Sequence, residues 1–561
     1  MIHYKKITKM ALLVLAVGVM AGCTKLDGKL NSTLSTSQAA AALGPAGTGY
    51  ILSGAYADLA GFLGYQDGLF SLEENTSDES LVPTRGGDWD DNGVWRVLHN
   101  HTWDANHGQI LNVFNALNKL NFDATNVLGY GPTPAQAAQA KVLRAYALYY
   151  LLDLYGQFPI RNPGDNLLLA PDVKTGADGV NFIISELKAA IPDLPAATGT
   201  NANLANKDVG NVLLMKCYLQ KGTFISRAAP TFDPADMAQV VTIGNAIIGS
   251  GTYDYSANYF DNFSPNNHST KEAIFMYPNT GGVGANHVGV ESRWNMTLHY
   301  NSWDKQAPNA GWNGFSTISD FYNSFGAVTA TSASNRVNGF FTGVGAKNNA
   351  DTLIDQRLGG RVTSNLTSTM TSGIRPGFLI GQQYDENGVA EKDRKGNPLA
   401  FDPAISPDMK ETGSNLEVTG IRIIKYAPDY NNYGGGPANN NLMIFRYPDV
   451  VLMVAEAKLR INANDASALT MVNDLRAKRG AAPLPSITLV NTSNIHDPNT
   501  LLSERGREFY WESLRRTDLE RFGVFNTIWQ YKPTDDPKYL LFPLPSQALA
   551  ANPNLKQNPG Y

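Results

Sequence analysis

Six of the eight tryptophans of this chain fall in two short windows of the sequence. The first window holds Trp89, Trp95 and Trp103, and the second holds Trp294, Trp303 and Trp312. Both windows are rich in Gly, Asn and Asp and poor in helical periodicity. An indole ring covers the C–H face of a sugar while amide and carboxylate groups beside it hydrogen bond the hydroxyls. The pattern therefore indicates a carbohydrate-binding surface built from loops.

Eight residues in and around these windows are the predicted ligand contacts. They are Arg85, Trp89, Asp91, Trp95, Trp294, Tyr300, Trp303 and Trp312. For any single tryptophan, the alternative is that the ring anchors a small core beneath the loops. We favour that alternative for Trp103, Trp511 and Trp529.

Neighbouring carboxylates raise the question of glycoside hydrolysis. The acids at 88, 90 and 91 and the pair Glu73 and Glu74 are the candidates. Hydrolysis needs two carboxyl groups on opposite sides of the scissile bond, about 5 to 9 Å apart. Adjacent acids in a Gly-rich loop are instead typical of solvated turns. We therefore predict a binding protein with no catalytic residues, and a secreted hydrolase is the hypothesis that we set aside.

The histidines and acids do not have the spacing of a metal site. His99 and His101 form the nearest histidine pair, and no partner set fits zinc. Residues 88–93 and 385–388 are similar to parts of a calcium loop, but the closing glutamate is missing from both. The sequence therefore predicts no metal and no cofactor.

The first residues have the layout of a secretory signal peptide. Three lysines precede an apolar run at 10–20, which is shorter than the 20 or so residues of a membrane-spanning helix. Ala21, Gly22 and Cys23 resemble a bacterial lipobox, in which the Cys23 thiol receives a diacylglyceryl group. We expect a signal peptide at 1–22, lipid on Cys23 and a tether at 23–40. The alternative is an ordinary signal peptide that is cleaved near a cysteine.

Composition excludes some functions and one source of stability. The net charge of −5 and the pI near 5.9 provide no basic stripe, so nucleic acid is not an expected partner. Without Cys23, Cys217 has no second cysteine with which to form an intramolecular disulfide. Stability must come from a packed core, for which a chain of 561 residues is long enough.

Apolar residues recur with a helical period near both ends of the chain. The predicted helices lie at 109–120, 134–155, 180–191, 208–222, 236–248, 447–461, 466–479 and 501–525. Short linkers between such segments favour antiparallel helix pairs. In the last segment, acids and arginines three and four residues apart are typical of a helix that is locked to its neighbours by ion pairs.

The middle of the chain has a different composition, rich in Gly, Asn, Ser, Thr and aromatic residues. We predict a short helix at 319–325, strands at 377–384 and 421–426, and turns at 385–388 and 395–397. Binding surfaces are commonly placed on loops that a rigid frame supports. The middle segment is therefore the predicted ligand-binding part.

Several longer motifs occur in a fixed order. They are 142–146 with 154–159, 446–457, 473–480, 504–509 with 512–519, and the C-terminal 542–545 with 552–561, which ends in Gln-Asn-Pro-Gly-Tyr. On these motifs the chain resembles the SusD/RagB family of nutrient-binding lipoproteins, and the resemblance runs from Cys23 to Tyr561.

The resemblance implies a mostly α-helical fold in which tetratricopeptide-like helix pairs form a right-handed superhelical scaffold. We expect a single domain over residues 41–561. Its scaffold is expected at 41–250 and 442–530, and a loop-rich ligand-binding insertion with short β-strands at 251–441.

The resemblance also implies a location and a function. We expect a lipid-anchored protein on the outer surface of the outer membrane, which captures oligosaccharides and delivers them to a SusC-like TonB-dependent transporter. The alternative is a RagB-type lipoprotein that captures peptides for a peptide transporter. Aromatic clusters bind peptides as well as sugars, so the residues leave both hypotheses open.

Overall fold

A computed structural model describes residues 36–279, 288–301, 311–325, 355–359, 376–383, 389–429 and 438–561. Outside these residues lie the predicted signal peptide, the predicted lipidation site Cys23, the predicted ligand contact Trp303 and the predicted turn at 385–388. Within the described ranges, no helix has an apolar stretch long enough to cross a membrane.

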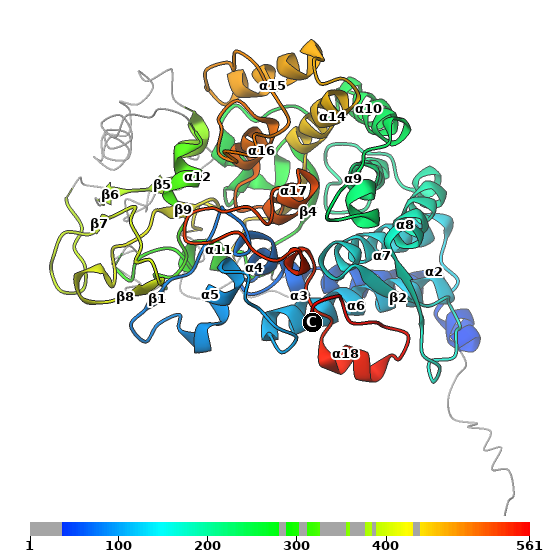
Figure 1. The fold of residues 1–561 in the computed structure, drawn as a ribbon. Helices are drawn as coiled ribbons and strands as arrows, with labels where there is room; N and C mark the ends of the chain where they lie inside the picture. Colours follow the sequence, from blue (N-terminus) through cyan, green and yellow to red (C-terminus); the bar gives the residue numbers. More distant parts are fainter. Residues whose placement is uncertain are drawn as a thin grey trace, which may run out of the picture.

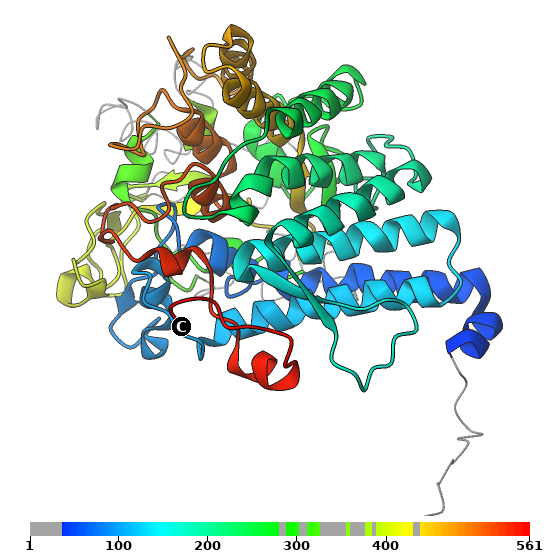
Figure 2. The ribbon, with the colours of Figure 1, turned by 45° about the vertical axis from the view of Figure 1, so that its right-hand side comes forward.

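Long helices make up most of the described chain. They are α2 (Thr36–Asp58), α6 (Gly108–Gly129), α7 (Pro134–Tyr155), α8 (Gly176–Ala190), α9 (Lys207–Ile225), α10 (Pro234–Gly249), α14 (Tyr447–Ile461) and α15 (Ala466–Lys478). Each packs against the next in this order, so the helices form a stack (Figure 2). The stack buries one continuous apolar core, and the prediction of a mostly helical fold is confirmed.

Shorter elements complete the fold, most of them beside the stack (Figure 1). The short helices are α3 (Ala60–Leu63), α4 (Leu69–Glu74), α5 (Val94–His99), α11 (Ser292–Asn295), α12 (Ser319–Asn323), α16 (Leu501–Phe509), α17 (Arg515–Arg521) and α18 (Ser546–Ala551). Turns of 3-10 helix lie at η1 (Asp91–Gly93), η2 (Ile191–Asp193), η3 (Tyr259–Phe263), η4 (Asn267–Ser269), η6 (Gln356–Leu358), η7 (Gly413–Asn415) and η8 (Pro537–Leu540).

The strands of the described residues form two-stranded sheets. The antiparallel pairs are β2 (Gln157–Ile160) with β3 (Asp172–Thr175), β4 (Ala273–Tyr277) with β10 (Leu442–Arg446), β5 (Gly377–Leu379) with β9 (Arg422–Ile424), and β6 (Gly381–Gln382) with β7 (Ala400–Phe401). The parallel pair is β1 (Thr84–Arg85) with β8 (Lys410–Glu411). Strands β5, β6 and β9 confirm the predicted strands, and the pairing of β4 with β10 joins the two ends of the middle segment.

Capping residues explain where α7 begins and ends. The Thr133 side chain accepts a hydrogen bond from the backbone of Gln136, whose side chain accepts one from the Thr133 backbone. This capping box satisfies N–H groups that have no partner within the helix, and Pro134 suits the first turn. Gly156 ends the helix in the left-handed conformation (φ 71°). The predicted bounds of this helix are confirmed.

Two predicted boundaries are wrong. Helix α2 begins at Thr36, inside the segment predicted as a tether. The prediction missed this start because the Ala- and Gly-rich sequence of the helix has almost no apolar periodicity. The predicted helix at 501–525 is two helices, α16 and α17. Trp511 (φ 58°) and Ser513 (φ 61°) between them adopt left-handed conformations that an α-helix does not contain.

A buried ionic cluster ties α16 to the rest of the protein. The Glu508 carboxylate accepts hydrogen bonds from Arg446 (3.0 Å), Arg479 (2.7 Å) and Arg357 (3.2 Å), and all four side chains are buried. Arg446 comes from β10, Arg479 follows α15 and Arg357 lies in η6, so with α16 the cluster joins four parts of the chain. The prediction that these charges lock the helix to its neighbours is confirmed.

Candidate functional site

The two tryptophan windows meet at one place on the protein. The indole nitrogen of Trp89 donates a hydrogen bond of 2.7 Å to the backbone carbonyl of Trp312, a residue 223 positions away in the chain. Both tryptophans are only partly buried. Trp89 lies between β1 and α5, in the part of the molecule labelled β1, α5 and β8 in Figure 1.

The buried rings of Trp95 and Phe315 pack against Trp89. Its ring meets Trp95 edge-on at 5.4 Å between centroids and Phe315 at 5.4 Å, and Trp95 and Phe315 lie 5.3 Å apart. Edge-to-face contacts of this kind fix the orientation of each ring. Gly314 completes the seat, because a Cβ atom at that position would lie 2.3 Å from the Trp89 ring. Trp89 is therefore held rigidly while part of it stays exposed.

The loop that carries Trp89 has a strained backbone. Trp89 (φ 60°), Asp91 (φ 39°) and Asn92 (φ 57°) all adopt positive φ angles, which residues other than glycine rarely do. The loop is pinned at its start, where the backbones of Arg85 and Asp88 exchange hydrogen bonds of 2.8 and 3.1 Å. Strain of this kind persists where the surrounding structure enforces it, and it concentrates at ligand-binding sites.

Tyr300 adds a third aromatic ring beside the loop. Its hydroxyl donates a hydrogen bond to the Asp88 carboxylate, and the guanidinium of Arg394 stacks over its ring at 3.8 Å from the centroid. Arg394 also donates from Nε to Glu417 over 2.8 Å. Partial burial, followed by the hydrogen bond to Asp88, raises the pKa of Tyr300 to about 12. The phenol is therefore a neutral donor at physiological pH.

His299 holds the backbone next to Tyr300 through a defined tautomer. The backbone N–H of Asn301 can only donate, so Nδ1 of His299 accepts that bond (3.0 Å) and Nε2–H donates to Glu417 (2.8 Å). Burial lowers the pKa of His299 to about 4. Burial alone would raise the pKa of Glu417, but hydrogen bonds from His299 and Arg394 outweigh it and lower the pKa. At neutral pH the pair is a neutral imidazole that donates to a carboxylate.

Three of the predicted ligand contacts are buried, which corrects the prediction that they present a surface. Arg85 is 2% exposed, and it donates to Thr419 O (2.8 Å) and to other acceptors of the same segment. Trp95 is 5% exposed and donates to Asp91 over 2.7 Å. Trp294 in α11 is 2% exposed. Burial lets these side chains satisfy polar partners or fill the core, and sequence composition does not distinguish this from exposure.

Two further predicted contacts are Asp91 and Trp303. Asp91 is exposed, and one of its oxygens orients Trp95. Trp303 lies outside the described residues, so its prediction stays open. The three tryptophans assigned to the core, namely Trp103, Trp511 and Trp529, are buried as predicted.

Sequence reasoning missed the polar side of the site. Asp88, His299, Arg394 and Glu417 were not among the predicted contacts. Arg394 comes from the segment after β6, and its contact with Tyr300 depends on how two distant loops fold against each other. The one local signal was the predicted turn at 395–397, which the structure has: Gly396 (φ 86°) donates to the Asp393 carbonyl over 3.0 Å.

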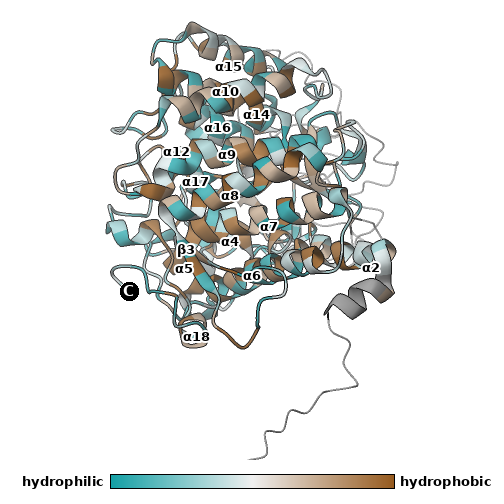
Figure 3. Ribbon diagram, turned by 90° about the vertical axis from the view of Figure 1, so that its right-hand side faces the viewer, coloured by the Kyte–Doolittle hydropathy of each residue, from teal (hydrophilic) through white to brown (hydrophobic). Residues whose placement is uncertain are grey.

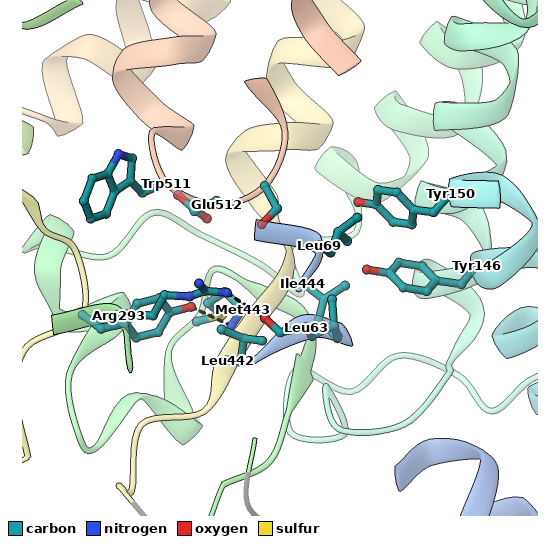
Figure 4. Close-up of a pocket in the computed structure, with 12 residues that line it drawn as sticks. Leu63, Leu69, Tyr146, Tyr150, Arg293, Leu442, Met443, Ile444, Trp511 and Glu512 are labelled. Carbon is teal, nitrogen blue, oxygen red and sulfur yellow. Dashed lines mark hydrogen bonds between the residues drawn. The ribbon is translucent and has the colours of Figure 1, made fainter. Parts of the chain in front are cut away.

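A small cavity lies among side chains of the core (Figure 4). Tyr146, Tyr150, Arg293, Trp511 and Glu512 are among the residues that line it. Its water-accessible volume is about 20 Å³, which has room for about one water molecule and not for a sugar ring. Nη1 of Arg293 has no hydrogen-bond partner within the described protein, so a buried water is the fitting occupant. Among the described residues, no group of three or more His, Cys, Asp or Glu is placed to hold a metal ion.

The family model described as "SusD family" matches residues 271–561, which include Tyr300, Trp312 and Arg394. This chain belongs to the SusD family. The starch-binding protein SusD of Bacteroides thetaiotaomicron is 23% identical over 526 residues, which cover 89% of this chain and 86% of that protein.

Solved structures of SusD proteins have the same fold. A SusD superfamily protein from Parabacteroides distasonis aligns with a TM-score of 0.65 at 16% identity, over 94% of this chain and 100% of that one. The surface glycan-binding protein A of Bacteroides thetaiotaomicron, in complex with laminarihexaose, aligns with a TM-score of 0.59 at 16% identity, over 91% of this chain and 98% of that one. At these identities the likeness establishes the fold of this SusD-family chain.

Proposed function

We propose that this SusD-family protein captures oligosaccharides at the cell surface and delivers them to a SusC-like TonB-dependent transporter. The observation that carries the proposal is the aromatic surface formed by Trp89, Trp312 and Tyr300. Two loops from distant parts of the chain bring these partly buried residues to one site, through the bond from Trp89 to the Trp312 backbone and the bond from Tyr300 to Asp88. The exposed side chains of Asp88 and Asp91 lie on the loop that carries Trp89, and exposed Arg394 reaches Tyr300 from the segment after β6.

This surface suits a sugar for a chemical reason. Ring faces cover the C–H groups of a pyranose, while carboxylate and guanidinium groups bond its hydroxyls. The supports under Trp89 and the contacts around Tyr300 fix the rings in advance, so little conformational entropy is lost when a ligand binds. The names of two similar proteins, one starch-binding and one solved with laminarihexaose, favour the same ligand class.

We propose that the site binds and does not catalyse. Asp88 accepts a hydrogen bond from Tyr300, and Asp91 accepts one from Trp95. Each of these carboxylates therefore orients an aromatic ring. An acid and base pair for hydrolysis would instead have to flank the scissile bond of a bound sugar.

We further propose that lipid on Cys23 anchors the protein to the outer membrane. Residues 41–561 then act as one binding domain, in which the helical stack is the scaffold and 251–441 contribute the loops around Tyr300 and Trp312. The lipobox-like residues Ala21 to Cys23 and the family of the chain support this location.

A binding screen tests the proposal directly. Purified full-length protein is titrated with a panel of oligosaccharides that includes malto- and laminari-oligosaccharides, and separately with a digest of protein. We expect at least one oligosaccharide to bind saturably and the digest not to bind. Saturable binding of peptides with no binding of any glycan would overturn the proposal in favour of peptide capture.

A further inference from the structure

The hairpin formed by β2 and β3 ends in three exposed leucines. Leu167, Leu168 and Leu169 are 63%, 93% and 65% exposed, although leucine is normally among the most buried residues. The polar groups of the same loop bond to one another, and these bonds are exposed as well. Arg161 donates to the carbonyls of Asn166 (3.2 Å) and Leu169 (2.6 Å). The loop therefore bonds polar groups within itself and leaves three aliphatic side chains in solvent.

The hairpin is fixed at its base, so the leucines are presented from a rigid support. Asn121 of α6 donates to the Pro159 carbonyl over 2.9 Å. On the other side, Asn554 near the C-terminus donates to the Pro171 carbonyl over 3.0 Å. Inside the tip, the Asn166 side chain accepts a hydrogen bond from the Leu168 backbone over 2.9 Å. This arrangement holds the three aliphatic side chains on one projecting tip.

The tip lies on the side of the protein from which the predicted lipid tether leaves. In Figures 1 and 2 the hairpin loop and α18 project from the lower side of the body, and α2 begins low on the same side. The hydropathy colouring shows the hairpin loop in brown (Figure 3). Twelve residues lie between Cys23 and Thr36, where α2 begins, so these two residues are at most about 45 Å apart in an extended chain. A lipid on Cys23 therefore keeps the start of α2 within about 45 Å of the membrane.

We propose that Leu167, Leu168 and Leu169 insert into the lipid surface and form a second contact with the membrane beside the acyl anchor. This inference rests on the proposed lipid anchor. The shape of the tip favours lipid over a protein partner, because a stable protein interface buries about 800 Å² on each side and needs a complementary surface. Three aliphatic side chains on a convex loop do not provide that area. A lipid surface accepts apolar groups without requiring a matching shape.

A second contact would set the orientation of the protein on the membrane. One point of attachment leaves the body free to rotate, whereas an attachment and an inserted tip together fix which side faces the lipid. In Figures 1 to 3 the end of the molecule that carries α15 would then point away from the membrane.

Depth-dependent fluorescence quenching tests this inference on the full, acylated protein. A bimane probe is attached at Ala170→Cys, next to the leucines, or at Lys478→Cys in α15 as the matched control; both native residues are exposed. The natural cysteines do not interfere, because Cys217 is buried and Cys23 is acylated in the proposed anchor. The protein is reconstituted on vesicles of phosphatidylethanolamine and phosphatidylglycerol that contain a doxyl-labelled lipid.

We expect the doxyl lipid to quench the probe at position 170 at least about twofold more than the probe at position 478. The triple variant L167S/L168S/L169S should abolish that difference, and its thermal unfolding should stay unchanged because the loop is exposed. Equal quenching at the two positions in vesicle-bound protein would overturn the inference and favour a protein partner for the tip.

Flotation and glycan binding of the same samples separate the possible failures. Protein that floats with vesicles and binds glycan, but shows no quenching at position 170, would overturn only the membrane contact. Protein that does not float would overturn the proposed anchor together with this inference. Quenching at position 170 without glycan binding would support the membrane contact and contradict the proposed function.

Discussion

The indole nitrogen of Trp89 donates a 2.7 Å hydrogen bond to the backbone carbonyl of Trp312, and this bond joins the two halves of the candidate site. Trp89 comes from a strained loop after β1, and Trp312 from the middle segment. Neither loop alone forms the aromatic surface. Changes that separate the two loops should therefore weaken ligand binding even when they touch no exposed group.

Replacing Gly314 by alanine tests this coupling. The added Cβ would lie 2.3 Å from the Trp89 ring, so the ring must move away from its seat. We expect oligosaccharide affinity to fall at least about tenfold, which corresponds to about 1.4 kcal/mol, as measured by isothermal titration calorimetry. Gly87→Ala is the matched control, because its Cβ meets no atom within 4 Å. Equal affinities of the two variants would show that the position of Trp89 does not matter.

The stacking of Arg394 on Tyr300 should contribute to affinity. Arg394→Lys keeps the charge but loses the flat guanidinium that lies 3.8 Å from the ring centroid and the Nε bond to Glu417. An exposed cation–π contact is worth about 0.5–1 kcal/mol, so we expect binding about two- to fivefold weaker. The neighbouring exposed Lys395→Ala should bind like the wild type. A larger loss in Lys395→Ala than in Arg394→Lys would contradict this role of Arg394.

His299 should make the protein sensitive to acid in a defined range. Its pKa is about 4 in the folded protein and 6.5 ordinarily, so the unfolded chain takes up the proton first as the pH falls. The stability that neutral His299 provides is therefore complete above about pH 6.5 and is lost progressively towards pH 4. The loss is at most about 3.5 kcal/mol, at roughly 1.4 kcal/mol per pKa unit.

The measurement compares denaturant unfolding of the wild type and His299→Gln between pH 7 and 4. The comparison separates the effect of His299 from that of buried acids, which stabilise the folded protein as the pH falls. Glu520, whose pKa burial raises to about 7, is one of these acids. We expect the stability difference between the two proteins to shrink as the pH falls. A difference that stays constant with pH would mean that the folded protein does not keep His299 neutral.

Glu508 should be among the residues on which stability depends most. Glu508→Gln removes the carboxylate to which the buried guanidinium groups of Arg446, Arg479 and Arg357 all donate. Breaking a buried ionic cluster in this way costs about 3–5 kcal/mol, which thermal unfolding would show as a large fall in Tm. Lys119→Ala, at a salt bridge whose lysine is 62% exposed, should cost less than about 1 kcal/mol. Similar costs for the two substitutions would refute the central role of the cluster.

Local chemistry made the helical scaffold predictable. Helix α7 follows from an apolar pattern, the capping box of Thr133 and Gln136, and a stop at Gly156. Helix α2 was missed because its small residues give almost no periodic signal. The break between α16 and α17 was missed because Trp511 adopts a left-handed conformation that tertiary contacts, and not residue type, impose.

The candidate site was only partly predictable for a related reason. The sequence indicated which aromatic residues lie in loops, but not which of them are covered. Trp89 and Trp294 have similar polar surroundings in the sequence, yet Trp89 is partly exposed and Trp294 is 2% exposed. The contact between Arg394 and Tyr300 depends on how separate loops fold together, which no local pattern encodes.

Oxidative footprinting with mass spectrometry tests the central claim most directly. The oxidation rate of each tryptophan is measured with and without a saturating oligosaccharide, and buried Trp511 serves as the internal reference. The proposed site predicts that the sugar lowers the oxidation rates of Trp89 and Trp312 severalfold and leaves Trp511 unchanged. A sugar that binds with full affinity while Trp89 and Trp312 oxidise as fast as before would contradict the proposed site.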